Sequence, residues 1–88
     1  MRGSDLHLLY FAWLRERVGK AEEVITLPEG VGTVGDLLAW LRGRGPGYAA
    51  ALANARTVRC AVNQDFAGPE TPVRAGDEVA FFPPVTGG

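Results

Sequence analysis

The chain has 88 residues, of which 47% are hydrophobic and 22% are charged, and this composition is typical of one small globular domain rather than of a disordered chain. A formal net charge of −1 gives no electrostatic reason to expect nucleic acid or an anionic membrane as a partner. The single cysteine excludes an internal disulfide, and no apolar run approaches the roughly 20 residues that span a bilayer. We therefore expect a cytoplasmic protein.

The N-terminal part of the chain predicts two strands with a short helical turn between them. We leave residues 1–4 out of the fold argument. Residues 6–13 (LHLLYFAW) are almost continuously apolar, which predicts a central strand covered on both faces. Residues 14–18 are expected to form one helical turn that ends at Gly19. Residues 22–27 (EEVITL) are rich in β-branched side chains and predict a second strand, paired with the first.

The main helix is predicted to begin at Thr33. Thr33 and Asp36 have the spacing of a capping box, in which the acidic side chain also favours the positive end of the helix. The apolar side chains that follow recur at helical spacing and give one stripe to pack on a sheet: Val34, Leu37, Leu38 and Leu41. Glycines and a proline within residues 43–47 end this helix, and the alanine-rich residues 48–54 predict a short second one.

Two more strands are predicted in the C-terminal part, at residues 57–62 (TVRCAV) and 78–82 (EVAFF). A turn at residues 63–65 and an irregular segment separate them. The first and last strands are both nearly all apolar, so we expect them to be parallel neighbours in the middle of the sheet, covered by the helix. This arrangement predicts an α+β protein of the β-grasp (ubiquitin-like) class, with a mixed sheet of four to five strands and one main helix.

Residues 83–88 (PPVTGG) are expected to form an extended tail beyond a domain of residues 1–82. Pro83 and Pro84 cannot extend a sheet ladder, because proline has no N–H donor. No side chain in this segment is charged. Gly87 and Gly88 have no Cβ, so the terminus can pass through a narrow channel with the Gly88 carboxylate at its tip.

These motifs resemble the MoaD family of ubiquitin-like sulfur carriers, the small subunits of molybdopterin synthase. The matching segments are LLYFAWLRERVG near the start, the AVNQDF turn, and GDEVAFFPPVTGG over residues 76–88. A terminal Gly-Gly alone is common to ubiquitin-like modifiers and is a weak signal. Its combination with GDEVAFFPPV is much narrower.

The resemblance implies that the chemistry takes place on the Gly88 carboxylate, with Gly87 as the other residue of the thin end. An adenylating enzyme (MoeB-like) would use ATP and magnesium to make an acyl adenylate, which a sulfur donor converts to a thiocarboxylate. The large subunit (MoaE-like) would receive this tail and pass its sulfur to cyclic pyranopterin monophosphate, building the dithiolene of molybdopterin within a heterotetramer. The chain itself would be a non-catalytic sulfur-donor subunit that binds no cofactor or metal.

The same resemblance implies a docking surface made by Phe11, Phe66 and Phe82, because the family uses apolar side chains at these positions to contact the large subunit. From the sequence alone, Phe11 and Phe82 could equally belong to the core, whereas Phe66 follows a polar turn and is expected at the surface. Arg15 matches a basic position that helps docking on the adenylating enzyme, although a solvated charge on a helix is the simpler interpretation.

In the tail, the resemblance assigns contacts with the partner to Pro83, Pro84, Val85 and Thr86, the prolines stiffening the exit and the other two acting as a spacer. Two other interpretations stay open. A related carrier would serve thiamine, cysteine or tRNA thiolation with the same thiocarboxylate, and a ubiquitin-like module would conjugate Gly88 to lysine or only bind. Cys60 alternates with valines and is expected to be a small buried side chain rather than the group that carries sulfur.

Overall fold

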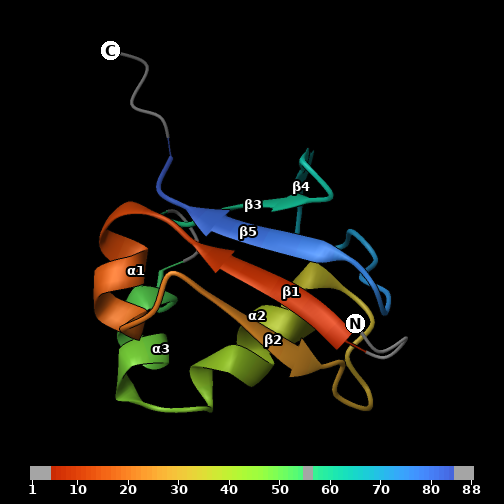
Figure 1. Cartoon of the computed structure of the whole chain (residues 1–88), viewed down its shortest axis with the longest axis horizontal. Coiled ribbons are helices and arrows are strands. Elements are labelled where there is room, and N and C mark those ends of the chain that lie inside the picture. Colours follow the sequence, from red (N-terminus) through yellow and green to blue (C-terminus); the bar gives the residue numbers. More distant parts are fainter. Residues whose placement is uncertain (1–4, 55–56, 85–88) are drawn as a thin grey trace.

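A computed structural model describes residues 5–54 and 57–84 of the chain (Figure 1). Within these residues the chain forms one mixed sheet, and α2 and α3 cover one of its faces. The elements follow one another as β1 (Asp5–Tyr10), α1 (Ala12–Val18), β2 (Glu22–Thr26), α2 (Val34–Arg42), α3 (Pro46–Ala51), β3 (Arg59–Val62), β4 (Asp65–Ala67) and β5 (Glu78–Phe82).

The sheet has the strand order β2-β1-β5-β3-β4, so the last strand of the chain occupies its centre. β1 and β5 are parallel neighbours, while β1–β2, β5–β3 and β3–β4 are antiparallel. This confirms the predicted pairing of the first and last strands and the α+β β-grasp fold. Because β1 and β5 run in the same direction, their C-terminal ends lie side by side, and the tail leaves from that end of the sheet.

The predicted first strand was too long and its burial was wrong. β1 ends at Tyr10, and the chain turns at Phe11 and Ala12, the latter with φ of +55°, into α1, which begins at Ala12 rather than at residue 14. Burial alternates along β1, because the side chains of only one face meet the helices: Leu6, Leu8 and Tyr10 are buried, whereas His7 and Leu9 are partly exposed. The apolar run therefore contains one half-covered strand and the start of a helix.

The predicted start of the main helix is confirmed in its details. The Thr33 hydroxyl accepts a hydrogen bond from the Asp36 N–H at 3.2 Å, and the Asp36 carboxylate accepts one from the Gly32 N–H at 3.1 Å. The hydrogen bond from Gly32 is the main reason that the pKa of Asp36 lies below its usual value. The short second helix, α3, exists but begins at Pro46, two residues earlier than predicted, because proline is favourable in the first turn of a helix.

The segment predicted to be irregular after residue 62 contains a strand. Asn63 and Gln64 both have positive φ, as in a two-residue hairpin turn, and the chain returns as β4 beside β3. The Asn63 side chain supports this turn by accepting from the Glu78 N–H and donating to Asp77. β3 begins at Arg59, two residues later than predicted.

The core lies between the sheet and its helices. Tyr10 and Phe81 are among its largest fully buried side chains, and their rings stack with centroids 5.6 Å apart. Cys60 is buried, as predicted, and burial raises the pKa of its thiol to about 11. No helix within the described residues combines the length and the apolar character needed to cross a membrane.

Candidate functional site

The site is built around the end of β5, where the tail leaves the sheet (Figure 1). Phe81 is held on the inner side by Tyr10, and its carbonyl accepts a hydrogen bond from the Phe11 N–H at 3.1 Å. Phe82 comes next and pairs with Arg59 of β3. The last residues before the tail are thus fixed by a strand on each side.

The tail itself is described only in part. Pro83 and Pro84 follow Phe82 without strand structure and are half-buried. Val85 to Gly88, which include the predicted reactive carboxylate, lie outside the described residues. The roles assigned to them from the sequence stay predictions.

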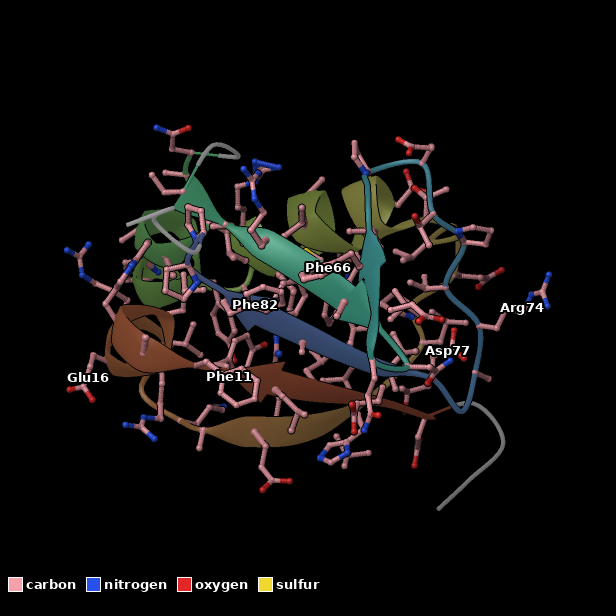
Figure 2. All side chains as sticks on the ribbon, turned by 90° about the horizontal axis from the view of Figure 1, so that it is seen from above. Phe11, Glu16, Phe66, Arg74, Asp77 and Phe82 are labelled. Carbon is pink, nitrogen blue, oxygen red and sulfur yellow. The ribbon has the colours of Figure 1, made fainter. Side chains whose placement is uncertain are left out.

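The three phenylalanines predicted to dock on a partner lie on the sheet face that points away from the helices, and Figure 2 looks onto that face. We call Phe11, Phe66 and Phe82 the aromatic face. Phe66 is 85% exposed, which confirms its expected surface position, and Phe11 is 48% exposed. Phe82 is half-buried, and its ring centroid lies 6.0 Å from that of Phe66. Phe11 and Phe82, whose position the sequence left open, are therefore not part of the buried core.

Sequence reasoning missed the smaller apolar side chains that continue this surface. The strand register places Leu9, Ala80, Ala61 and Phe66 side by side across β1, β5, β3 and β4. Val24 on β2 lies on the same side of the sheet and is 56% exposed. The sequence did contain a signal for these residues. Side chains two apart on a strand point to the same face, and Leu9 and Ala80 stand two residues before Phe11 and Phe82.

Between the rings of Phe66 and Phe82 the surface is hollowed. An open depression of about 370 Å³ is lined by Arg59, Cys60, Phe66, Ala67 and Phe82. Its walls are mostly apolar, and Arg59 is the one charged residue among those that line it. A depression with this lining can accept an apolar side chain of another protein, and it lies directly beside the tail exit.

Arg15 lies on α1 and is exposed. Its Nε lies 4.0 Å from a carboxylate oxygen of Glu16, a contact that contributes little because both groups are solvated. Its proposed part in docking stays a prediction.

Beneath the sheet, Glu23 joins three elements in a way that the sequence did not reveal. Its carboxylate accepts hydrogen bonds from the hydroxyls of Tyr10 at 2.8 Å and Tyr48 at 2.7 Å, and from Arg44 at 2.9 Å. Burial alone would raise the pKa of Glu23, but the hydrogen bonds from Tyr48, Arg44 and Tyr10 outweigh it and hold this pKa below its usual value. An ionised carboxylate with its oxygens already occupied is a structural group rather than a catalytic base.

The described residues contain no group of three His, Cys, Asp or Glu side chains that could hold a metal ion. His7 instead lies 2.7 Å from a carboxylate oxygen of Glu22, on the sheet face away from the helices.

The ThiS family matches the chain over residues 8–88, nearly its whole length. The chain belongs to the ThiS family. Among the relatives of this ThiS family member, the molybdopterin synthase sulfur carrier subunit of Haemophilus influenzae is 39% identical over 83 residues, which cover 94% of this chain and 99% of that protein. The Escherichia coli protein of the same name is 39% identical over 85 residues, with the same coverage.

A solved structure is similar to this chain in fold as well as in sequence. The putative molybdopterin converting factor subunit 1 of Pyrococcus furiosus has a TM-score of 0.76 and 30% identity to this ThiS family member, and the match covers 92% of this chain and 98% of that one. Together with the relatives, it confirms the resemblance to the MoaD family that the terminal motif indicated.

Proposed function

We propose that the chain is the sulfur carrier subunit of a molybdopterin synthase. The observation that carries the proposal is the position of β5: the terminal motif emerges from the central strand of a rigid sheet, directly beside an exposed aromatic face. Relatives of nearly equal length are molybdopterin synthase sulfur carrier subunits by name. The chain would present a reactive terminus and a surface that docks it.

The proposed chemistry takes place on the carboxylate of Gly88, which is a poor acyl electrophile until it is activated. In an adenylating partner, a carboxylate oxygen attacks the α-phosphorus of magnesium-bound ATP, and pyrophosphate leaves. Sulfur at the sulfide level, supplied as hydrosulfide by the donor, then attacks the acyl carbon; AMP leaves with the electron pair of the broken C–O bond, and the S–H proton is released. The product is a thiocarboxylate, in which sulfur replaces one terminal oxygen.

The thiocarboxylate would then enter the active site of a large subunit and donate its sulfur to cyclic pyranopterin monophosphate. Two such donations are needed for one dithiolene, so the carrier alternates between its two partners. This chain contributes positioning, because β1 and β3 hold Phe81 and Phe82 and thereby fix the point from which the tail extends. Charge stabilisation and acid–base chemistry belong to the partners.

Intact mass spectrometry tests the proposal. The chain is incubated with its adenylating enzyme, ATP, magnesium and a sulfur source, and we expect a mass gain equal to the replacement of one oxygen by sulfur. Omission of ATP is the matched control and should leave the mass unchanged. A chain that never gains this mass would count against every carrier function.

The two other interpretations give different results in the same assay. A carrier for thiamine, cysteine or tRNA thiolation would gain the sulfur but would not lose it to a molybdopterin synthase large subunit. A conjugating module would instead appear as an adduct joined to lysine through Gly88.

A further inference from the structure

Positively and negatively charged side chains gather at opposite ends of the molecule, measured along the direction of the strands. The described residues contain seven Arg and Lys side chains. Six of them lie near the C-terminal ends of β1 and β5 or on the helices beside these ends: Arg15, Arg17, Lys20, Arg42, Arg44 and Arg59. Three acidic side chains accompany them, Glu16, Glu22 and Glu23. The other seven acidic side chains of the described residues lie away from this end, together with Arg74, the remaining cation of those residues. Figure 2 shows Arg74 and Asp77 at one end of the molecule and Glu16 at the other. A chain with an overall charge near zero thus has a positive end from which the tail leaves.

Most charges at this end are already engaged within the chain. Lys20 and Arg44 lie 3.6 Å and 2.9 Å from a carboxylate oxygen of Glu23. Arg17 lies over the ring of Trp13, with its guanidinium carbon 5.6 Å from the ring centroid. These side chains have local reasons for their positions.

Arg59 differs from them in place and in environment. It is exposed at the start of β3, it pairs with Phe82 in the sheet register, and it lines the depression between Phe66 and Phe82. Among residues 5–54 and 57–84, no carboxylate lies within ion-pairing distance of it. Within the described residues, a cation without a carboxylate partner therefore lies on the docking face, opposite the last residue before the tail.

A protein that covers Phe66 and Phe82 has to cover Arg59 as well, because the three residues share one depression. Removing an unpaired guanidinium from water is costly, and a carboxylate in the partner offsets this cost by a charge-assisted hydrogen bond. A bidentate pair would also fix the orientation of the two proteins, which a purely apolar contact does not.

We propose that the large subunit which receives the tail places an Asp or Glu against Arg59, and that Arg59 determines the specificity of this interface. The inference rests on the proposed function, since that function supplies the partner. The carboxylate lies at the mouth of the channel that admits the tail, because Arg59 is opposite Phe82. The positive end of the chain steers the tail toward this acidic rim.

Binding of the large subunit from the same organism to the full chain tests this, measured by calorimetry and stopped flow at several salt concentrations. Arg59→Leu keeps the bulk of an apolar docking surface and removes the charge, and Arg59→Glu reverses it. Arg74→Glu is the matched control, because it makes the same charge change at the far end of the molecule. Thermal melts of the three variants verify that each is folded.

We expect Arg59→Leu and Arg59→Glu each to raise the Kd by about tenfold or more, and Arg59→Glu also to slow association most at low salt. Arg74→Glu should stay within about twofold of the original chain. Tighter binding by Arg59→Leu would overturn the proposal, because it would mean an apolar partner surface. Equal effects of Arg59→Glu and Arg74→Glu would overturn it too, since only net charge would then matter.

The failure of the proposed function gives a distinct result. If the unaltered chain does not bind the large subunit, both proposals fail together. If it binds and donates sulfur while Arg59→Leu binds equally well, only the role of Arg59 fails.

Discussion

Glu23 shows how a single charged residue holds the positive end of the molecule together. It lies on β2, its side chain is only 11% exposed, and it receives hydrogen bonds from Tyr10 of β1, Tyr48 of α3 and Arg44. Tyr10 in turn stacks on Phe81, one residue before Phe82. The carboxylate is thus part of the support beneath the tail exit.

Replacing Glu23 by Gln should lower the free energy of unfolding by about 1.5–3 kcal/mol, the usual range for hydrogen bonds to a charged group. The folded-state pKa of Glu23 lies below its ordinary value of 4.5. Its ionised form therefore adds stability that is complete above that value and is lost as the pH falls through the folded-state pKa. Urea unfolding of both proteins between pH 7 and pH 3 should show their difference shrinking in acid.

Glu29→Gln, an exposed change of the same kind, is the control for Glu23→Gln and should have little effect. A difference between the original chain and Glu23→Gln that does not change with pH would show that the charge of Glu23 is not what stabilises the fold.

A substitution at Phe66 can test docking without disturbing the fold, because its ring is almost fully exposed. Phe66→Ala should leave the free energy of unfolding within about 0.5 kcal/mol of the original value. It should weaken binding of the large subunit by about 1–3 kcal/mol, the cost of removing an interface anchor. Glu29→Ala, an exposed change in the loop after β2 and outside the aromatic face, is the control and should leave the affinity almost unchanged. Unchanged affinity of Phe66→Ala in calorimetry would remove Phe66 from the docking surface.

At the scale of elements, the close approach of α3 to the end of α1 depends on Gly47. A Cβ on this residue would lie 2.5 Å from the carbonyl oxygen of Arg17, and backbone atoms of a helix cannot move aside as a flexible side chain can. Gly47→Ala should therefore cost about 1–3 kcal/mol of unfolding free energy through overpacking.

Gly43→Ala is the comparison for Gly47→Ala. Its Cβ would meet the nearest atom, the Trp40 carbonyl oxygen, at 3.4 Å, and its φ of −79° suits any residue. Thermal melts should show a clear loss for Gly47→Ala and almost none for Gly43→Ala. Equal melting temperatures would mean that α3 can shift without cost.

Elements with strong local signals could be predicted from the sequence. The capping residues and the apolar stripe located α2, and two apolar strands at the chain ends gave the parallel β1–β5 pair. The end of β1 before Phe11 was missed because the apolar residues continue without a break from the strand into α1, so composition does not mark the boundary. β4 was missed because three residues carry too little periodicity.

The candidate site could be predicted where the terminal motif was informative and not where it depended on contacts between distant segments. Phe66 was expected at the surface from the polar turn before it. The Glu23 cluster brings together residues 13 to 25 positions apart, and the place of Arg59 beside Phe82 follows only from the pairing of β3 with β5. No local pattern encodes such contacts.

At the scale of the whole molecule, the domain and the tail should be separable. Chain ends usually add little to the stability of a domain, and residues 5–54 and 57–84 already contain a cluster of buried hydrophobic side chains. Deleting Gly88 should abolish sulfur loading and leave the melting temperature almost unchanged. A large fall in melting temperature would show that the terminus packs on the domain and is not free to enter a partner.

The central claim is that sulfur travels on Gly88 from one partner to the other. Its most direct test is the intact mass of the thiocarboxylated chain before and after it is mixed with the large subunit and cyclic pyranopterin monophosphate. We predict that the mass returns to that of the unmodified chain as molybdopterin forms, with two thiocarboxylated chains used for each product. A thiocarboxylate that persists in the presence of a bound, competent large subunit and its substrate would contradict it.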